Sequence, residues 1–166
     1  MIDLETYKKN AVFKNLCEEY TEKWNGCNTK KKLVDMALGA KGMDYLCASI
    51  AQGWGLSPKY IVDNFEPYIN GRYVSEQEGY TSKMFCCHLG EVNADTTAII
   101  LIESDVVLNV PQNALCEVYA TGNSFIELKG EGKAVFICYG NPDDIKIMGD
   151  EKNYKRINKK DRDYYE

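Results

Sequence analysis

The clearest pattern of apolar and polar positions lies between residues 93 and 140, where small residues recur every ten positions. Between them apolar and polar residues alternate, as in Val106–Val110, which is the period-2 pattern of a strand with one buried face. A strand of about five residues and a turn of about four fill such a period. The stretch therefore predicts a series of short strands with regularly spaced turns. The small residues are Ala94, Ser104, Ala114, Ser124 and Ala134.

Two β architectures fit this spacing. In a β-solenoid, each strand with its corner forms one face of a coil, and stacked corners must superimpose, so small residues recur in register. An antiparallel meander that closes into a sandwich or barrel also repeats its strands about every 8–12 residues. The strict register of the small residues favours the solenoid, and the meander is the alternative.

Two runs in this stretch, Asn113–Tyr119 and Lys133–Tyr139, resemble the Asn-Ala-x-Val-x-Val-Tyr repeats of small β-solenoid proteins of phages and mobile elements. Lys133 stands where the repeat has Asn, so the match is incomplete. The resemblance implies a β-solenoid fold and a phage or mobile-element source, with an accessory or inhibitory role. It implies no catalytic residue, because the motif is structural.

The first 66 residues show a helical period instead. Thr29 and Ser57 are suited to helix N-caps, and Pro58 is suited to a first helical position. Trp54 lies in a Gly-rich turn that lacks the spacing of a phosphate-binding loop, and we expect it to pack between helices. Apolar residues at helical spacing predict one helix over 1–25 (Phe13, Leu16, Cys17, Tyr20 and Trp24), a second (Leu33, Met36, Ala37 and Ala40) and a third (Met43, Leu46, Cys47, Ile50 and Ala51).

We therefore predict an α+β protein with three parts. A helical subdomain over 1–75 ends in a hairpin at Asn70-Gly71, which is the strongest short-range hairpin signal in the chain. A β-rich module covers 80–148, and a charged tail covers 149–166. Because the tail is basic and has no core-forming period, we expect it to be mobile.

Composition narrows the functional classes. The 166 residues carry a net charge of −5, which disfavours nonspecific nucleic-acid binding by the whole surface. No apolar run approaches the roughly 20 residues of a membrane helix, and residues 1–5 lack the basic-then-apolar pattern of a signal peptide. The seven cysteines are odd in number and mostly in apolar positions, which indicates a reduced cytoplasmic protein. With no Cys-x-x-Cys pair and His88 as the one histidine, we expect no metal and no cofactor.

The weak catalytic candidates are Cys86 and His88, since a thiolate beside an imidazole is a nucleophile pair in some hydrolases. The sequence supplies no orienting carboxylate or oxyanion hole for them. We therefore assign no catalytic residue and expect both to be strand residues of the β-rich half.

Five residues are candidates for contact with a partner. Tyr119 and Tyr139 lie twenty residues apart, so they are predicted to stack as an aromatic strip on one solenoid face, usable by a partner protein or a glycan. Tyr154, Lys155 and Arg156 in the tail could contact nucleic acid through stacking and phosphate pairing.

These features favour a non-enzymatic interaction or structural protein, with homo-oligomers as one way to use a rigid face. The alternatives are a small-ligand or nucleotide-binding module, with its pocket between the two halves, and a cysteine-dependent enzyme. No membrane partner is expected.

Overall fold

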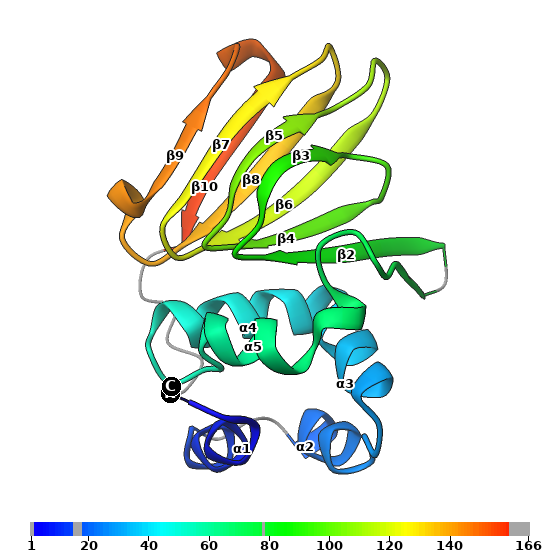
Figure 1. The fold of residues 1–166 in the computed structure, drawn as a ribbon, viewed down its shortest axis with the longest axis vertical. Helices are drawn as coiled ribbons and strands as arrows, with labels where there is room; N and C mark the ends of the chain where they lie inside the picture. Colours follow the sequence, from blue (N-terminus) through cyan, green and yellow to red (C-terminus); the bar gives the residue numbers. More distant parts are fainter. Residues whose placement is uncertain (1, 15–17, 78, 160–166) are drawn as a thin grey trace.

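The computed structural model describes residues 2–14, 18–77 and 79–159, and it shows helices followed by a two-sheeted β-solenoid (Figure 1). The predicted α+β class is confirmed, and the β-rich part is solenoid-like rather than a meander. The described residues contain α1 (Leu4–Phe13), α2 (Glu18–Asn25), α3 (Lys30–Ala37), α4 (Ala40–Ala51), α5 (Pro58–Asn64) and the 3₁₀ helix η1 (Glu66–Tyr68).

The helices begin where the sequence supplies caps. The side-chain oxygen of Thr29 accepts a hydrogen bond from the Lys32 N–H at 3.2 Å, and that of Ser57 accepts one from the Tyr60 N–H at 3.1 Å. These contacts confirm both predicted N-caps, with Pro58 at the first turn of α5. The single helix predicted over 1–25 is instead two helices, α1 and α2. Residues 15–17, which carry part of its predicted stripe, lie outside the described residues.

Two sheets form the solenoid, and the chain passes from one to the other along each coil (Figure 1). Neighbouring strands are parallel in both, except that β1 is antiparallel to β2. The first sheet contains, in spatial order, β1 (Ser75–Gln77), β2 (Tyr80–Cys86), β4 (Ala98–Ile102), β6 (Leu115–Thr121), β8 (Lys133–Tyr139) and β10 (Tyr154–Lys159). The second sheet contains β3 (Leu89–Asn93), β5 (Asp105–Asn109), β7 (Ser124–Lys129) and β9 (Ile145–Met148).

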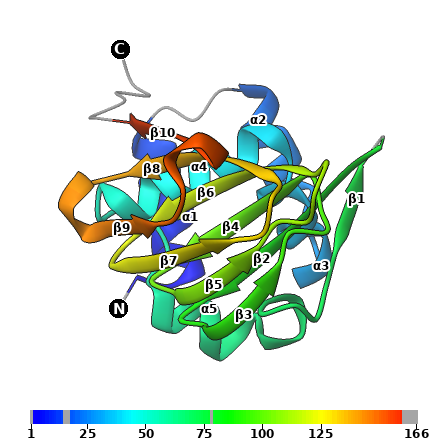
Figure 2. The same cartoon turned by 90° about the horizontal axis from the view of Figure 1, so that it is seen from above.

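The first sheet is the middle of three layers, with the helices on one face and the second sheet on the other (Figures 1 and 2). β4 shows this arrangement because all five of its residues are buried. Ile100 belongs to the same apolar cluster as Leu46 of α4, whereas its neighbour Ile99 belongs to the cluster that contains Val106 of β5. A strand that is covered on both faces needs no polar alternation, which explains the continuous apolar run 98–102.

The ten-residue register holds between β5 and β7, whose paired residues lie twenty positions apart. It fails on the first sheet, where Ala134 pairs with Cys116 instead of Ala114. The cause is corner length, because the connection over 110–114 is two residues longer than the one over 130–132. The predicted column of five small residues is therefore wrong as a stacking register, although the solenoid that it predicted is present.

The hairpin lies at a different place from the one predicted. Asn70 and Gly71 do form a turn, with φ of 58° and 85°, but no strands flank it. The antiparallel hairpin is formed by β1 and β2 instead, so residues Ser75–Gln77, at the boundary between the two predicted parts, contribute a strand.

The charged tail also differs from the prediction. Residues Tyr154–Lys159 form β10, which pairs with β8 along its whole length. The ring of Tyr154 packs edge-on against Phe136 at a centroid distance of 5.6 Å. One inward-facing aromatic residue gives no sequence period, which is why the pattern did not reveal this strand.

Candidate functional site

Of the catalytic candidates, Cys86 is the last residue of β2, whereas His88 lies in the corner between β2 and β3 and is not the strand residue that the sequence predicted. Cys86 is buried beneath the helices, where its thiol donates a hydrogen bond to the Pro58 carbonyl at 3.4 Å, and burial raises the pKa of the thiol well above its ordinary value. His88 lies beyond Cys87, whose φ of 52° turns the chain, and its ring packs on Phe85 at 5.0 Å. The arrangement therefore does not bring a thiolate and an imidazole together.

The tyrosine strip predicted for a partner is covered by the helical layer. Tyr119 is 8% exposed and Tyr139 is 3% exposed. The Tyr139 hydroxyl donates a hydrogen bond to the Asp44 carboxylate of α4, and the Tyr119 hydroxyl donates one to Glu117 at 3.3 Å. The prediction that these rings form an exposed strip is wrong, because the sheet face that carries them is an internal interface.

The three tail candidates have different roles in β10. The Arg156 guanidinium donates to the carbonyls of Pro142 and Ile145, both at 2.8 Å, so it fixes the turn η2 (Pro142–Asp144) that leads into β9. Tyr154 is half-buried against the core. Only Lys155 of the three is exposed, so it is the one that remains directly accessible to a partner.

At one end of the first sheet the edge strand is β1, and β2 beside it is covered along its length. β1 pairs with the first half of β2, from Tyr80 to Ser82. Asn70 covers the second half, because its N–H donates to the Met84 carbonyl at 2.8 Å and its side-chain oxygen accepts the Cys86 N–H at 2.9 Å. The edge at this end is therefore reduced to the three residues of β1.

The opposite edge, at β10, has no such cover in the described part of the chain. β10 pairs with β8 over six residues, and no described strand pairs with its other side. Alternate residues of a parallel strand point their N–H and C=O groups away from the neighbour, so this edge carries unpaired donors and acceptors.

The side chains along this edge have a simple alternation, and we call Lys155, Ile157 and Lys159 the basic edge. Ile157 pairs with Ile137, which packs against the helical cluster, so the three residues lie on the helix-side face of the sheet. Lys155 and Ile157 are exposed, Ile157 by 38%, and Lys159 is half-buried. Among the residues that the structure describes, neither lysine has an ion-pair partner.

A polar crevice of about 360 Å³ lies between the helical layer and the solenoid corners. Ala51 and Tyr139 belong to its apolar lining. Its polar lining includes Glu103, Asn123 and Asp144, which come from the corners that precede β5, β7 and β9. The two charged residues among these three are both carboxylates.

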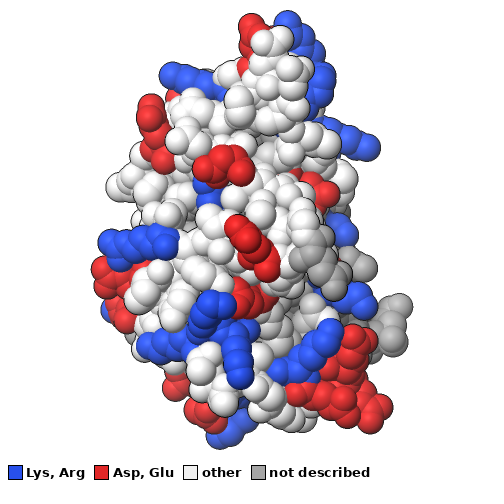
Figure 3. All heavy atoms as spheres, turned by 90° about the vertical axis from the view of Figure 1, so that its right-hand side faces the viewer, with Lys and Arg blue, Asp and Glu red and all other residues white. Residues whose placement is uncertain are grey.

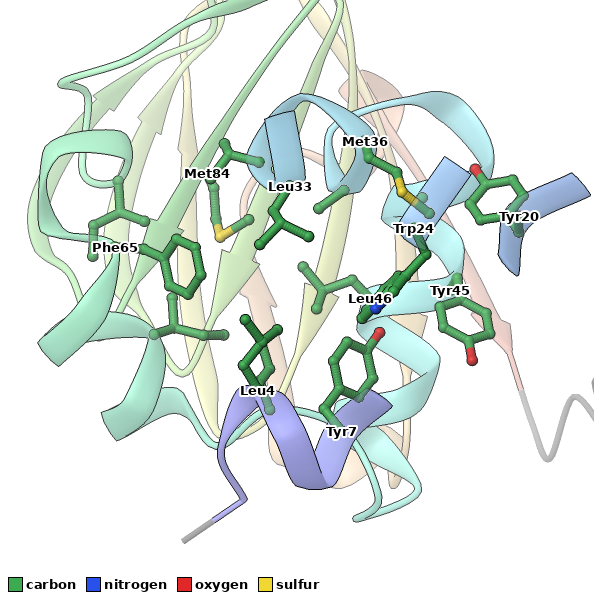
Figure 4. A pocket seen from close by; sticks show the side chains of 16 residues that line it. Leu4, Tyr7, Tyr20, Trp24, Leu33, Met36, Tyr45, Leu46, Phe65 and Met84 are labelled. Atoms are coloured by element: carbon green, nitrogen blue, oxygen red, sulfur yellow. The ribbon is translucent and has the colours of Figure 1, made fainter. Parts of the chain in front are cut away.

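A second cavity, of about 60 Å³, lies inside the helical layer (Figure 4). Tyr7, Trp24, Leu46, Phe65 and Met84 are among the side chains that converge on it. Small-molecule sites are typically about 300–1,000 Å³, so this space is a packing defect of the helical core. Its surroundings include Trp54, which is 8% exposed and stacks on a tyrosine ring, as the sequence predicted for a core residue.

The surface and the helices add two constraints. Basic and acidic side chains are interspersed over the face shown in Figure 3. Among the described residues, no helix is long and apolar enough to cross a membrane, and no cluster of three or more His, Cys, Asp or Glu side chains could hold a metal ion.

No family model, curated protein or solved structure matches this chain. The basic edge and the polar crevice are therefore distinguished by geometry and chemistry alone.

The crevice was missed by the sequence reasoning. It lies beside corners where the chain turns through positive φ, at Glu103 (44°), Gly122 (74°) and Gly140 (88°). The two glycines mark such corners in the sequence, because glycine adopts positive φ without strain. Glu103 gives no such signal, and the unequal coil lengths hide its alignment with the other coils.

Proposed function

We propose that this protein is a non-enzymatic binding module that takes up an extended segment of a partner protein as an added strand beside β10. The observation that carries the proposal is the difference between the two ends of the first sheet. The chain covers β2 and leaves only the three-residue β1 as the edge strand there, whereas the six residues of β10 have no described strand on their other side. Strand addition gives affinity through main-chain hydrogen bonds, and the alternating side chains give selectivity.

A rigid scaffold supports this role. β10 is held by β8 along six residues, by the Tyr154–Phe136 ring contact and by the two Arg156 hydrogen bonds. The edge is therefore ordered before a partner arrives, which lowers the entropy lost on binding. Lysines on an edge strand also oppose aggregation in many proteins, and a partner that depends on this edge distinguishes recognition from that protective role.

The test is an affinity capture from the source cells with the full chain as bait, read by mass spectrometry. Ile157→Asp alters the centre of the basic edge. Leu89→Asp is the matched control, because Leu89 is an exposed apolar residue (77%) in β3, the edge strand of the second sheet at the other end of the solenoid. We expect a protein that is retained by the wild type and by Leu89→Asp and is lost with Ile157→Asp. Equal retention by all three baits, or no retained protein, would contradict the proposal.

A small-ligand module is the second candidate, favoured by the volume and the polar lining residues of the crevice. Native mass spectrometry of the protein purified from its source should then show a bound small molecule. Ala51→Phe would fill the space at the end of α4 and should remove that adduct, while Leu115→Phe, at a residue that is 64% exposed and distant in the fold, should not. An unliganded mass for the wild type would set this candidate aside. The phage or mobile-element role and the cytoplasmic location remain predictions.

A further inference from the structure

We infer that the segment bound at β10 is an acidic, extended peptide with the pattern acid–x–apolar–x–acid. The inference deepens the proposed function and rests on it. It follows from the alternation of the basic edge, in which two lysines flank one isoleucine on a single face of the strand.

The spacing of the basic edge fixes the spacing in the partner. Side chains on one face of a strand recur every second residue, and side chains directly opposite on neighbouring strands have Cβ atoms about 4.5–5.5 Å apart. A strand beside β10 therefore places one residue opposite each of Lys155, Ile157 and Lys159. Carboxylates opposite the lysines and an apolar residue opposite Ile157 complement the charge and the exposed apolar surface. The pattern reads the same in both directions, so it applies to parallel and antiparallel addition.

A second copy of the chain does not satisfy this edge. Antiparallel pairing of β10 with itself about Ile157 would set Lys155 of one copy opposite Lys159 of the other, at both ends of the contact. Like charges directly opposite one another on neighbouring strands are destabilising. The charge pattern therefore opposes self-association and favours an acidic partner.

The opposite face of β10 contributes little to selection. Arg156 is already bound to two backbone carbonyls, and Tyr154 packs on Phe136. The x positions of the peptide would lie beside Arg156 and Asn158, and the Asn158 side-chain oxygen already accepts a hydrogen bond from Arg156 at 2.8 Å. We therefore expect tolerance at the x positions and selectivity at the acidic and apolar ones.

The test uses two capped peptides of identical composition in NMR titrations of the full chain. Thr-Glu-Thr-Val-Thr-Glu-Thr carries the proposed pattern, and Thr-Thr-Glu-Val-Glu-Thr-Thr moves the acids to the face opposite the valine. We expect the first peptide to bind more tightly by about tenfold, because only it places both carboxylates opposite lysines. Equal affinities would overturn the pattern.

A charge exchange supplies the decisive comparison. The double variant Lys155→Glu/Lys159→Glu should bind Thr-Glu-Thr-Val-Thr-Glu-Thr, which we call the Glu peptide, with an affinity at least about tenfold below that of the wild type. It should bind Thr-Lys-Thr-Val-Thr-Lys-Thr, which the wild type rejects. Both lysines are on the surface, and an unchanged melting temperature would show that the variant is folded. A variant that binds neither peptide, or one that still prefers the Glu peptide, would overturn the inference.

The outcomes separate this inference from the proposed function. If affinity capture shows a partner that depends on Ile157 but the peptides do not discriminate, strand addition stands and the acidic pattern fails. If no peptide binds and no partner is captured, both fail. A single-stranded RNA oligonucleotide gives a further outcome. If the wild type binds it more tightly than the Glu peptide and the double variant does not bind it, the lysines recognise phosphate and the peptide inference is overturned.

Discussion

Substituting adjacent isoleucines of β4 tests whether the helices and the solenoid form one three-layered core. Ile99 and Ile100 are both fully buried, and they point to opposite faces of the same strand. Ile99 packs between the two sheets, whereas Ile100 packs beneath the helices. If the helical layer were not docked on the sheet, Ile100 would be exposed and Ile99 would still be buried.

The size of the effect follows from this burial. Truncating a fully buried isoleucine to alanine costs about 2–5 kcal/mol, through lost apolar contact and the cavity left behind. In a chain of this length, each kcal/mol lowers the melting temperature by about 2–4 °C, so each variant should melt about 4–20 °C lower. Leu115 is 64% exposed, and Leu115→Ala should change the free energy of unfolding by no more than about 0.5 kcal/mol.

Urea unfolding followed by two probes measures these changes. Tryptophan fluorescence reports the helical layer, because Trp24 and Trp54 both lie there, and far-ultraviolet circular dichroism reports helices and strands together. We expect Ile99→Ala and Ile100→Ala to lower the urea midpoint similarly in both signals. If Ile100→Ala behaves like Leu115→Ala, the reasoning about the docked helical layer is refuted.

Four further outcomes are expected. Deleting residues 152–166 should lower the free energy of unfolding by at least about 1 kcal/mol, because it removes β10 and a ring contact, and an unchanged urea midpoint would show that β10 is dispensable. Under native conditions at pH 8, a thiol reagent should label the exposed Cys87 quickly and Cys116 slowly, because burial raises the pKa of Cys116 to about 12; comparable rates at both would contradict that burial. The free energy of unfolding should fall as the pH rises from about 9 toward 12. Burial raises the pKa of both Cys116 and Tyr80 to about 12, so the unfolded chain loses these two protons at a lower pH than the folded protein does. A free energy that stays constant over this pH range in urea unfolding would be inconsistent with this. Gly122→Ala should lower the free energy of unfolding by about 1–2 kcal/mol, because Gly122 has a φ of 74°, which residues with a side chain rarely adopt. An unchanged free energy of unfolding would show that the corner lies elsewhere.

Much of the fold could be predicted because local signals and packing agree. The period-2 alternation of residues 93–140 predicted strands, and the caps at Thr29 and Ser57 marked helix starts. The stacking register could not be predicted in full, because it depends on corner lengths that the repeat pattern does not constrain. The hairpin was misplaced for a related reason, since the turn at Asn70-Gly71 satisfies the edge of β2 rather than joining two strands.

The candidate site was less predictable than the fold. Tyr119 and Tyr139 alternate like surface residues of a strand, and only the docking of α4 buries them. The tail residues were identified as partner contacts, but the strand that organises them depends on a tertiary contact of Tyr154. The open edge is a property of strand order, and no local sequence signal encodes which strand is last in a sheet.

Amide hydrogen exchange in β10, measured by NMR with and without the Glu peptide, tests the central claim most directly. An added strand would pair with the outward-facing N–H groups of Tyr154–Lys159, so alternate amides in this range should become protected while the others, already bonded to β8, should change little. The predicted result is this alternating protection, confined to β10. Binding without protection in β10, or protection at the crevice corners near Glu103 and Gly122 instead, would contradict strand addition at this edge.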